Sequence, residues 1–280
     1  LNAWLAGQLD SPQGGSGQGR SNAYDFARNS YNWKGSNTRK MRASLGKAMA
    51  GTTRAEWHVV GDSTSSAYIG TGYDYLNMWP RVMRSQLAIV GIPVGGTGFV
   101  PLSNPTQQDP RWTFTGSWTV AANNGFATGN SAGSTATFAT TTQGSETGTE
   151  MSLWYFGSAT GFNITVDGTA PAGANVAVTQ GSYSAGAVTP GGGTVVVKLT
   201  VTGLTSATHS LVVTCSGGGT YMIGASLSAA SGLAVNNISI LGARADYWAD
   251  TSDTTGYQLT RKNSVTTTPD AIFLALGIND

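Results

Sequence analysis

A serine at the end of a short apolar run is the residue of this chain best suited to chemistry. Val59 and Val60 favour a buried strand, Gly61 permits a sharp turn, and the small polar residues over 62–66 suit the start of a helix. Ser63 would then lie at the carboxyl end of a strand, where ligands bind in open α/β sheets. The helix end would offer N–H groups to a developing oxyanion. Gly-Asp-Ser is also an ordinary turn, so this stretch alone does not establish a catalytic site.

Two further apolar runs end in the same way. The run over 270–276 stops at Gly277 and is followed by the side-chain amide of Asn279. The run over 237–241 stops at Gly242. Strands that end in a hydroxyl and an amide carry complementary groups for acyl transfer, because a nucleophile needs preorganised donors for the charge that it creates.

Together the three stretches resemble the SGNH (GDSL-like) hydrolase family. The first block of the family matches Gly61, Asp62 and Ser63, and the third block matches Gly277, Asn279 and Asp280. The second block is the weakest match, because Ser239 replaces the first glycine of the family's Asn-x-Gly-x-x-Gly while Gly242 is kept. The resemblance covers roughly residues 56–90 and 234–280 and leaves the middle of the chain unexplained.

The resemblance implies a role for each matched residue. Ser63 would be the nucleophile, and its backbone N–H, the N–H of Gly242 and the amide of Asn279 would form the oxyanion hole. Asp62 and Asp280 would support the turn and the site, because a carboxylate with a pKa of about 4 is a poor base for a serine hydroxyl. No cofactor is implied, and metal-site spacing is absent from the sequence.

The matched blocks contain no residue that could act as the general base for Ser63. SGNH enzymes supply it from a later Asp-x-x-His block, which this sequence does not contain. The chain has two histidines. His58 precedes Ser63 on the expected strand, where a rise of about 3.3 Å per residue would separate the two, and His209 lies in the middle region, where we expect a structural role. We therefore expect residues 1–280 to be the first part of a longer chain, with the catalytic His and Asp downstream, and the assignment as an enzyme depends on that block.

Composition and net charge exclude some classes of binding partner. A net charge of +1 and 10% charged residues give no basic field for nucleic acid. No signal peptide is visible and no apolar run approaches the roughly 18 residues of a membrane span. The single cysteine, Cys215, cannot form an internal disulfide and is expected to be a buried small hydrophobe, with a reactive thiol as the alternative.

The chain divides into three regions. Residues 1–35 have the composition of a linker or N-terminal arm. Residues 36–109 and 234–280 are assigned to a discontinuous, truncated hydrolase domain, with an amphipathic helix expected over 37–50 and another around Pro80. We expect the first helix to pack on the sheet ahead of strand one, in preference to a membrane surface.

Residues 110–233 are assigned to an inserted antiparallel β-sandwich or jelly roll. Short runs rich in Thr, Val and aromatic residues alternate there with Gly, Ser and Asn clusters, and Asp167-Gly168 is a hairpin turn signal. The strands are expected at 112–114, 117–120, 136–139, 150–156, 162–167, 194–201 and 209–214. The fold class expected for the whole chain is α/β: an SGNH-type three-layer parallel sheet, incomplete at the C-terminus, with the sandwich inserted.

The aromatic residues of the insertion allow two interpretations. Flat rings can stack on sugars, and the candidates for such a glycan-binding platform are Trp112, Trp118, Trp154 and Tyr155. The same alternation is typical of core residues, which is the interpretation we favour.

Two functions from different classes follow. The first is a serine esterase that removes acyl groups, most simply acetyl, from a cell-surface polysaccharide. The second is a non-catalytic adsorption module that binds host glycan on an SGNH scaffold. Low charge and high Gly, Thr, Ser and Ala content resemble bacteriophage tail or receptor-binding proteins. The expected location is therefore a virion tail or the cell exterior, with glycan, other tail proteins or further copies of the chain as partners.

Overall fold

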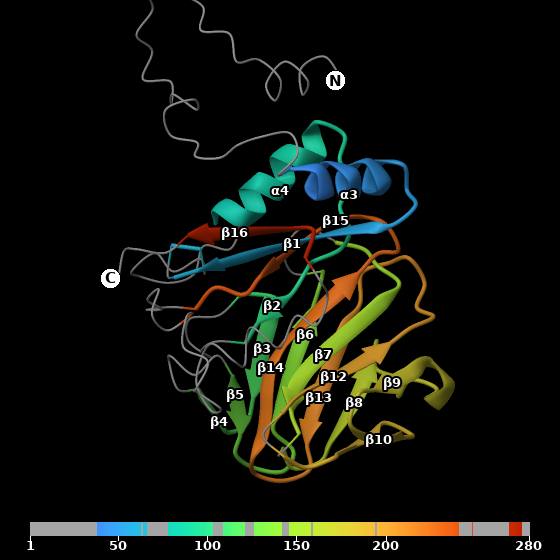
Figure 1. The fold of residues 1–280 in the computed structure, drawn as a ribbon. Helices are drawn as coiled ribbons and strands as arrows, with labels where there is room; N and C mark the ends of the chain where they lie inside the picture. The colour runs from blue at the N-terminus through green and yellow to red at the C-terminus, as the bar shows by residue number, and fades with distance from the viewer. Residues whose placement is uncertain are drawn as a thin grey trace, which may run out of the picture.

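The computed structural model describes residues 38–62, 64–65, 78–102, 109–120, 126–141, 146–157, 159–193, 195–240, 248 and 269–275. Within these residues, a small parallel sheet lies between two helices and a large antiparallel β-sandwich (Figure 1).

The parallel sheet has β1 (Arg54–Gly61) at its centre, between β15 (Gly232–Asn237) and β16 (Ala271–Ala275). Both neighbours run parallel to β1, and Gly61 lies opposite Ala275. The expected pairing between the strand before Ser63 and the strand before Gly277 is therefore confirmed over the described residues. Because the strands are parallel, the chain leaves all three at the same edge of the sheet.

One face of this sheet is covered by helices. Ala55, Trp57 and Val59 are at most 4% exposed and form an apolar cluster with residues of α3 (Arg39–Met49) and α4 (Trp79–Ile89). Both helices lie on the same side of the sheet (Figure 1). The helix expected over 37–50 thus packs on the sheet ahead of strand one, and Pro80 occupies the first turn of α4 as expected.

The antiparallel strands form two sheets packed face to face. The six-stranded sheet has the order β10 (Gly181–Ser184), β11 (Ala187–Pro190), β8 (Phe162–Val166), β13 (Ser210–Cys215), β6 (Thr135–Ala139) and β3 (Trp112–Thr115). The seven-stranded sheet has the order β4 (Trp118–Val120), β5 (Ala127–Gly129), β14 (Thr220–Ser228), β7 (Glu150–Phe156), β12 (Val196–Val201) and β9 (Val176–Val178), with β2 (Val100–Pro101) paired to β14. A 3₁₀ turn, η1 (Gly173–Asn175), precedes β9. The strands expected from the sequence in this region are confirmed.

The sandwich core fills the space between its two sheets. The largest fully buried side chains include Trp112, Tyr155, Phe138 and Phe162, and all four belong to one continuous cluster. The turn signal at Asp167-Gly168 is confirmed: both residues have positive φ, +52° and +80°, and Val166 and Thr169 bond across the turn. The single cysteine, in β13, is 2% exposed and burial raises the pKa of its thiol, which supports its role as a small hydrophobe.

The α/β fold class expected for the whole chain is wrong. Among the described residues, most strands lie in the two antiparallel sheets, three are parallel, and α3 and α4 cover one face of the parallel sheet. On the other face, Val60 and Ile238 pack in a cluster with Trp154 of β7, Ile223 of β14 and Trp248, whose backbone is helical. The outer face of the sandwich therefore packs against this face of the sheet, and the described residues form a mainly antiparallel β protein carrying a small parallel sheet.

Candidate functional site

The site begins with the turn that follows β1. Asp62 is 1% exposed, and its Oδ1 accepts hydrogen bonds from the backbone N–H (2.9 Å) and the hydroxyl (2.8 Å) of Thr64. The backbone N–H of Ser65 donates to the carbonyl of Asp62 at 3.2 Å. Asp62 thus holds the turn, the role expected for it.

Gly61 permits this turn because Ser65 and the last residue of β16 lie very close to its backbone. A Cβ at position 61 would lie 2.5 Å from Oγ of Ser65 and 2.9 Å from the carbonyl oxygen of Ala275. Neither distance is compatible with a side chain, so the approach of the turn and of β16 to this point requires glycine.

The segments that follow the other two strands start beside the end of β1. The N–H of Asp62 donates to the carbonyl of Ala275, the last residue of β16, at 3.3 Å. After β15, the N–H of Ile240 donates to the carbonyl of Gly61 at 3.1 Å. The three stretches that carry the family resemblance therefore converge at one edge of the parallel sheet.

Several expected site residues lie outside the described residues. They are Ser63, Gly242, Asn279 and Asp280. The described residues nearest to them in sequence are Asp62 and Thr64 for the nucleophile, Ile240 for Gly242, and Ala275 for the third block. The assignment of the nucleophile and the oxyanion hole therefore stays a prediction.

Neither histidine of the chain lies beside the turn. His58 is in β1, opposite Asn236 of β15 and Ile272 of β16, and is 6% exposed. Burial lowers the pKa of His58 below its usual value, against the opposing effect of Glu56, so its ring is neutral at pH 7. Its Nε2 is buried without a hydrogen-bond partner.

His209 is held in the sandwich by both ring nitrogens. Its Nδ1 lies 2.7 Å from a carboxylate oxygen of Asp167, and its Nε2 lies 2.9 Å from the carbonyl oxygen of Thr205. Both partners are acceptors, so they favour the doubly protonated ring. Burial lowers the pKa of His209, but the hydrogen bonds to Asp167 and Thr205 outweigh it and the net direction is upward. This arrangement supports the structural role expected for His209.

The four aromatic residues considered for glycan stacking do not form an exposed platform. Trp112 is 1%, Trp154 is 5% and Tyr155 is 0% exposed. Trp118 is half-buried, packs against the sandwich core and tilts against Phe114 with ring centroids 5.0 Å apart. The rings face their neighbours in the protein, which is the core interpretation favoured from the sequence.

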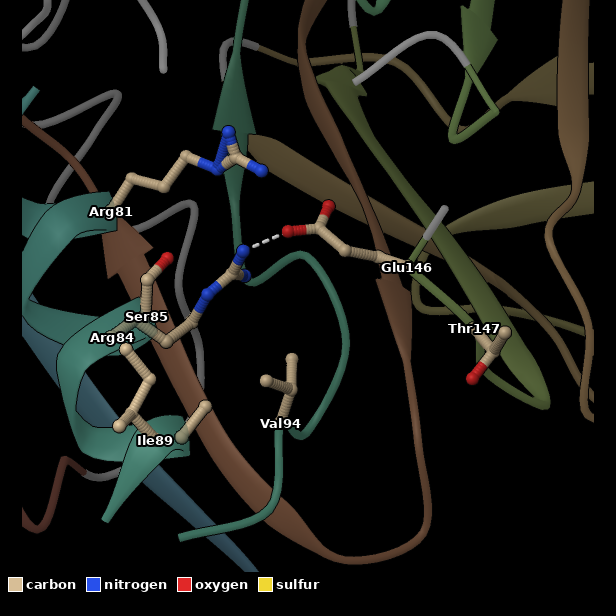
Figure 2. A pocket seen from close by; sticks show the side chains of 8 residues that line it. Arg81, Arg84, Ser85, Ile89, Val94, Glu146 and Thr147 are labelled. Carbon is tan, nitrogen blue, oxygen red and sulfur yellow. Dashed lines mark hydrogen bonds and ion pairs between the residues drawn. The ribbon is translucent and has the colours of Figure 1, made fainter. Parts of the chain in front are cut away.

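A pocket of about 380 Å³ lies between α4 and the segment that precedes β7. Figure 2 shows Arg81, Arg84 and Ser85 reaching it from α4, with Glu146 on the opposite side. Arg84 and Glu146 form a buried ion pair across it, and Arg84 also donates to the carbonyl of Gly96 at 2.8 Å. Its volume is at the small end of the range for ligand pockets.

The same ion pair belongs to a larger buried network. The other oxygen of Glu146 accepts from Arg111 at 2.9 Å, and Arg111 forms a two-pronged pair with Asp109 at 2.9 and 2.7 Å. All four side chains are at most 11% exposed. This network joins α4 to the segments that precede β3 and β7, and no local pattern indicates it because Arg84 and Glu146 are 62 residues apart.

Sequence reasoning also missed two residues that contact the turn. Asn237, at the end of β15, donates from Nδ2 to the carbonyl of Ser65 at 2.7 Å. Trp79, at the start of α4, donates from its indole Nε1 to Oγ of Ser65 at 2.9 Å. The signal available for Asn237 was its place as the first residue of the second block, whereas Trp79 lies in the helix expected around Pro80 and carries no signal of its own.

Comparison with known proteins shows a similarity of fold to a solved structure. No protein-family model and no curated protein sequence matches the chain. A solved structure of a peptidoglycan O-acetylesterase is similar in fold, with a TM-score of 0.50 and 18% sequence identity, over 88% of this chain and 62% of the esterase chain. The chain thus spans about 62% of the length of that esterase. At this identity the similarity shows the fold alone, and it does not bear on an origin in a virion tail.

Two further properties concern the described residues. No helix among them is long and apolar enough to cross a membrane. They also contain no group of three or more His, Cys, Asp or Glu side chains placed to hold a metal ion.

Proposed function

We propose that the protein is a serine esterase that removes O-acyl groups, most simply acetyl, from a polysaccharide. The observation that carries this proposal is the convergence of the three strand ends, at Gly61, Asn237 and Ala275, on one edge of the parallel sheet. A nucleophile at the end of the central strand, with donors from the ends of both neighbours, is the arrangement that acyl transfer requires. The fold similarity to a peptidoglycan O-acetylesterase supports the same reaction class and a glycan substrate.

In this proposal the general base takes the hydroxyl proton of Ser63 as Oγ attacks the ester carbonyl, and it returns that proton to the leaving alkoxide of the sugar. The acyl group passes to Ser63 Oγ, and water then releases it as a carboxylic acid. The N–H groups of Ser63 and Gly242 and the side-chain amide of Asn279 stabilise the oxyanion of both tetrahedral intermediates. Asp62 contributes by fixing the turn rather than by moving a proton.

The base that activates Ser63 is proposed to come from outside residues 1–280. His58 lies in the middle of the sheet, and His209 is bonded at both nitrogens within the sandwich. Because neither can reach the turn, these two side chains cannot supply the base. An Asp-x-x-His segment of a longer form of the protein is the simplest source.

The non-catalytic alternative has less support. Three of the four rings proposed for glycan stacking are at most 5% exposed. A location on a virion tail stays a prediction that no observation on this structure favours.

The test is ester hydrolysis by the longer protein with small aryl acetates and with an O-acetylated polysaccharide. Ser63→Ala should reduce the rate by several orders of magnitude. Asn279→Ala should reduce it about a hundredfold to a thousandfold, because it deletes one donor of a shared hole. Full activity in Ser63→Ala would overturn the proposal.

A further inference from the structure

We propose that Asn237 and Trp79 are positioning residues that fix the nucleophile-bearing turn through Ser65. This inference rests on the proposed function. It adds two side chains, from a neighbouring strand and from a helix, that do not belong to the expected catalytic set.

Asn237 connects two of the three segments that meet at the site. Its Nδ2 donates to the carbonyl of Ser65, and its Oδ1 accepts from the backbone N–H of Ser239 at 3.1 Å. The side chain is 6% exposed, so both bonds are shielded from water. One amide thus ties the turn after β1 to the segment that leads toward Gly242, and it needs both its donor and its acceptor to do so.

Trp79 connects the same turn to α4 and β16. Its indole N–H donates to Oγ of Ser65, which is fully buried. Its ring meets Phe273 of β16 edge-on, with centroids 6.4 Å apart, and Phe273 also contacts Trp57 of β1 at 5.1 Å. Trp79 therefore ties the hydroxyl of Ser65 to α4 and, through Phe273, to β16.

Ser65 is an effective point at which to hold the turn. The carbonyl of Ser65 accepts a hydrogen bond from Asn237, and its hydroxyl oxygen accepts one from Trp79. Its backbone N–H donates to the carbonyl of Asp62. Both sides of position 63 are therefore fixed. Displacing a reacting group by about 1 Å can cost on the order of a hundredfold in rate, so these contacts should act on catalysis more than on stability.

Two conservative variants separate positioning from folding. Asn237→Asp keeps the acceptor for Ser239 and removes the donor to Ser65. Trp79→Phe keeps an aromatic ring against Phe273 and removes the indole N–H. The matched control is Trp57→Phe, because Trp57 packs on the same ring and its buried Nε1 has no hydrogen-bond partner.

The experiment measures kcat and KM for aryl acetate hydrolysis by the longer protein, with the melting temperature of each variant. We expect Asn237→Asp and Trp79→Phe to lower kcat about tenfold to a hundredfold with KM changed less than about twofold. Trp57→Phe should keep the kcat of the parent protein. In Asn237→Asp, the ratio of variant to parent kcat should rise as the pH falls toward the ordinary carboxyl range, because a protonated carboxyl can again donate to Ser65.

Hydrogen exchange at the peptide containing Thr64 and Ser65 gives a readout independent of turnover. It should be faster in both variants than in the parent protein and in Trp57→Phe. If Ser63→Ala abolishes hydrolysis but both variants keep the parent kcat and the parent exchange rate, the positioning role is wrong and the proposed function stands. If Ser63→Ala leaves hydrolysis unchanged, the proposed function is wrong and the positioning role falls with it.

Discussion

The sandwich and the parallel sheet differ in how each completes its core. The sandwich packs two sheets of its own against each other and buries Trp112, Phe138 and Tyr155 between them. The parallel sheet packs against α3 and α4 on one face and against the outer face of the sandwich on the other. The sandwich core therefore lies between its own two sheets, whereas one face of the sheet that carries the candidate site packs on a neighbouring region. We accordingly keep the division into an inserted sandwich and a discontinuous remainder as a proposal.

The largest expected effect contrasts one phenylalanine from each region. Phe138→Ala empties a fully buried position of the sandwich core and should lower the free energy of unfolding by about 3–5 kcal/mol. Phe273→Ala, at a half-buried position of β16, should lower the free energy of unfolding by less than half as much. Urea unfolding of both variants measures the difference. An equal decrease in the free energy of unfolding of the two variants would show that the two regions share one core.

The next effect tests the buried network between the regions. Glu146→Leu removes the carboxylate that balances Arg84 and Arg111 and should cost about 3 kcal/mol. The double variant Arg84→Met/Glu146→Leu should recover part of this loss, because the charge at position 84 is removed together with its partner. A double variant less stable than Glu146→Leu would argue against the network as the link between α4 and the sandwich.

A pair of glycine variants tests the crowding at the sheet edge. Gly61→Ala should lower stability by about 1–3 kcal/mol, because its Cβ would overlap Ser65 and the backbone of Ala275. Gly46→Ala lies in the exposed interior of α3 with nothing within 4 Å, and should raise stability by about 0.5–1 kcal/mol. Thermal unfolding of the two variants should therefore shift in opposite directions, and a neutral Gly61→Ala would be incompatible with the described turn.

The smallest effect is the pH dependence contributed by His209. Its raised pKa means that its stabilising contribution is fully present below the unfolded value of about 6.5 and is lost as the pH rises through the folded value. The contribution should be below about 1 kcal/mol, because the Asp167 side chain is 51% exposed. The stability difference between the parent protein and His209→Gln should shrink from pH 6 to pH 9. A difference that grows over this range would contradict the assigned bonds.

The sequence predicted the parts of the fold that depend on local patterns. Short β-rich runs predicted seven of the sandwich strands but missed β5, β9, β10, β11 and β14. The glycine-terminated apolar runs predicted the pairing of β1 with β16. The fold class failed because nothing local shows that Trp154 and Ile223, on the outer face of the sandwich, cover the parallel sheet. Within the site, the role of Asp62 followed from its neighbours, whereas the contact of Asn237 with Ser65 spans 172 residues and has no local signature.

The most direct test of the central claim is to trap the acyl-enzyme. The longer protein would be mixed with an aryl acetate, quenched within the first turnovers and mapped by peptide mass spectrometry. The account predicts an acetyl group on the peptide containing Ser63, absent in Ser63→Ala and diminished in Asn237→Asp. Hydrolysis that proceeds with Ser63 unmodified, or with the acetyl group on another residue, would contradict it.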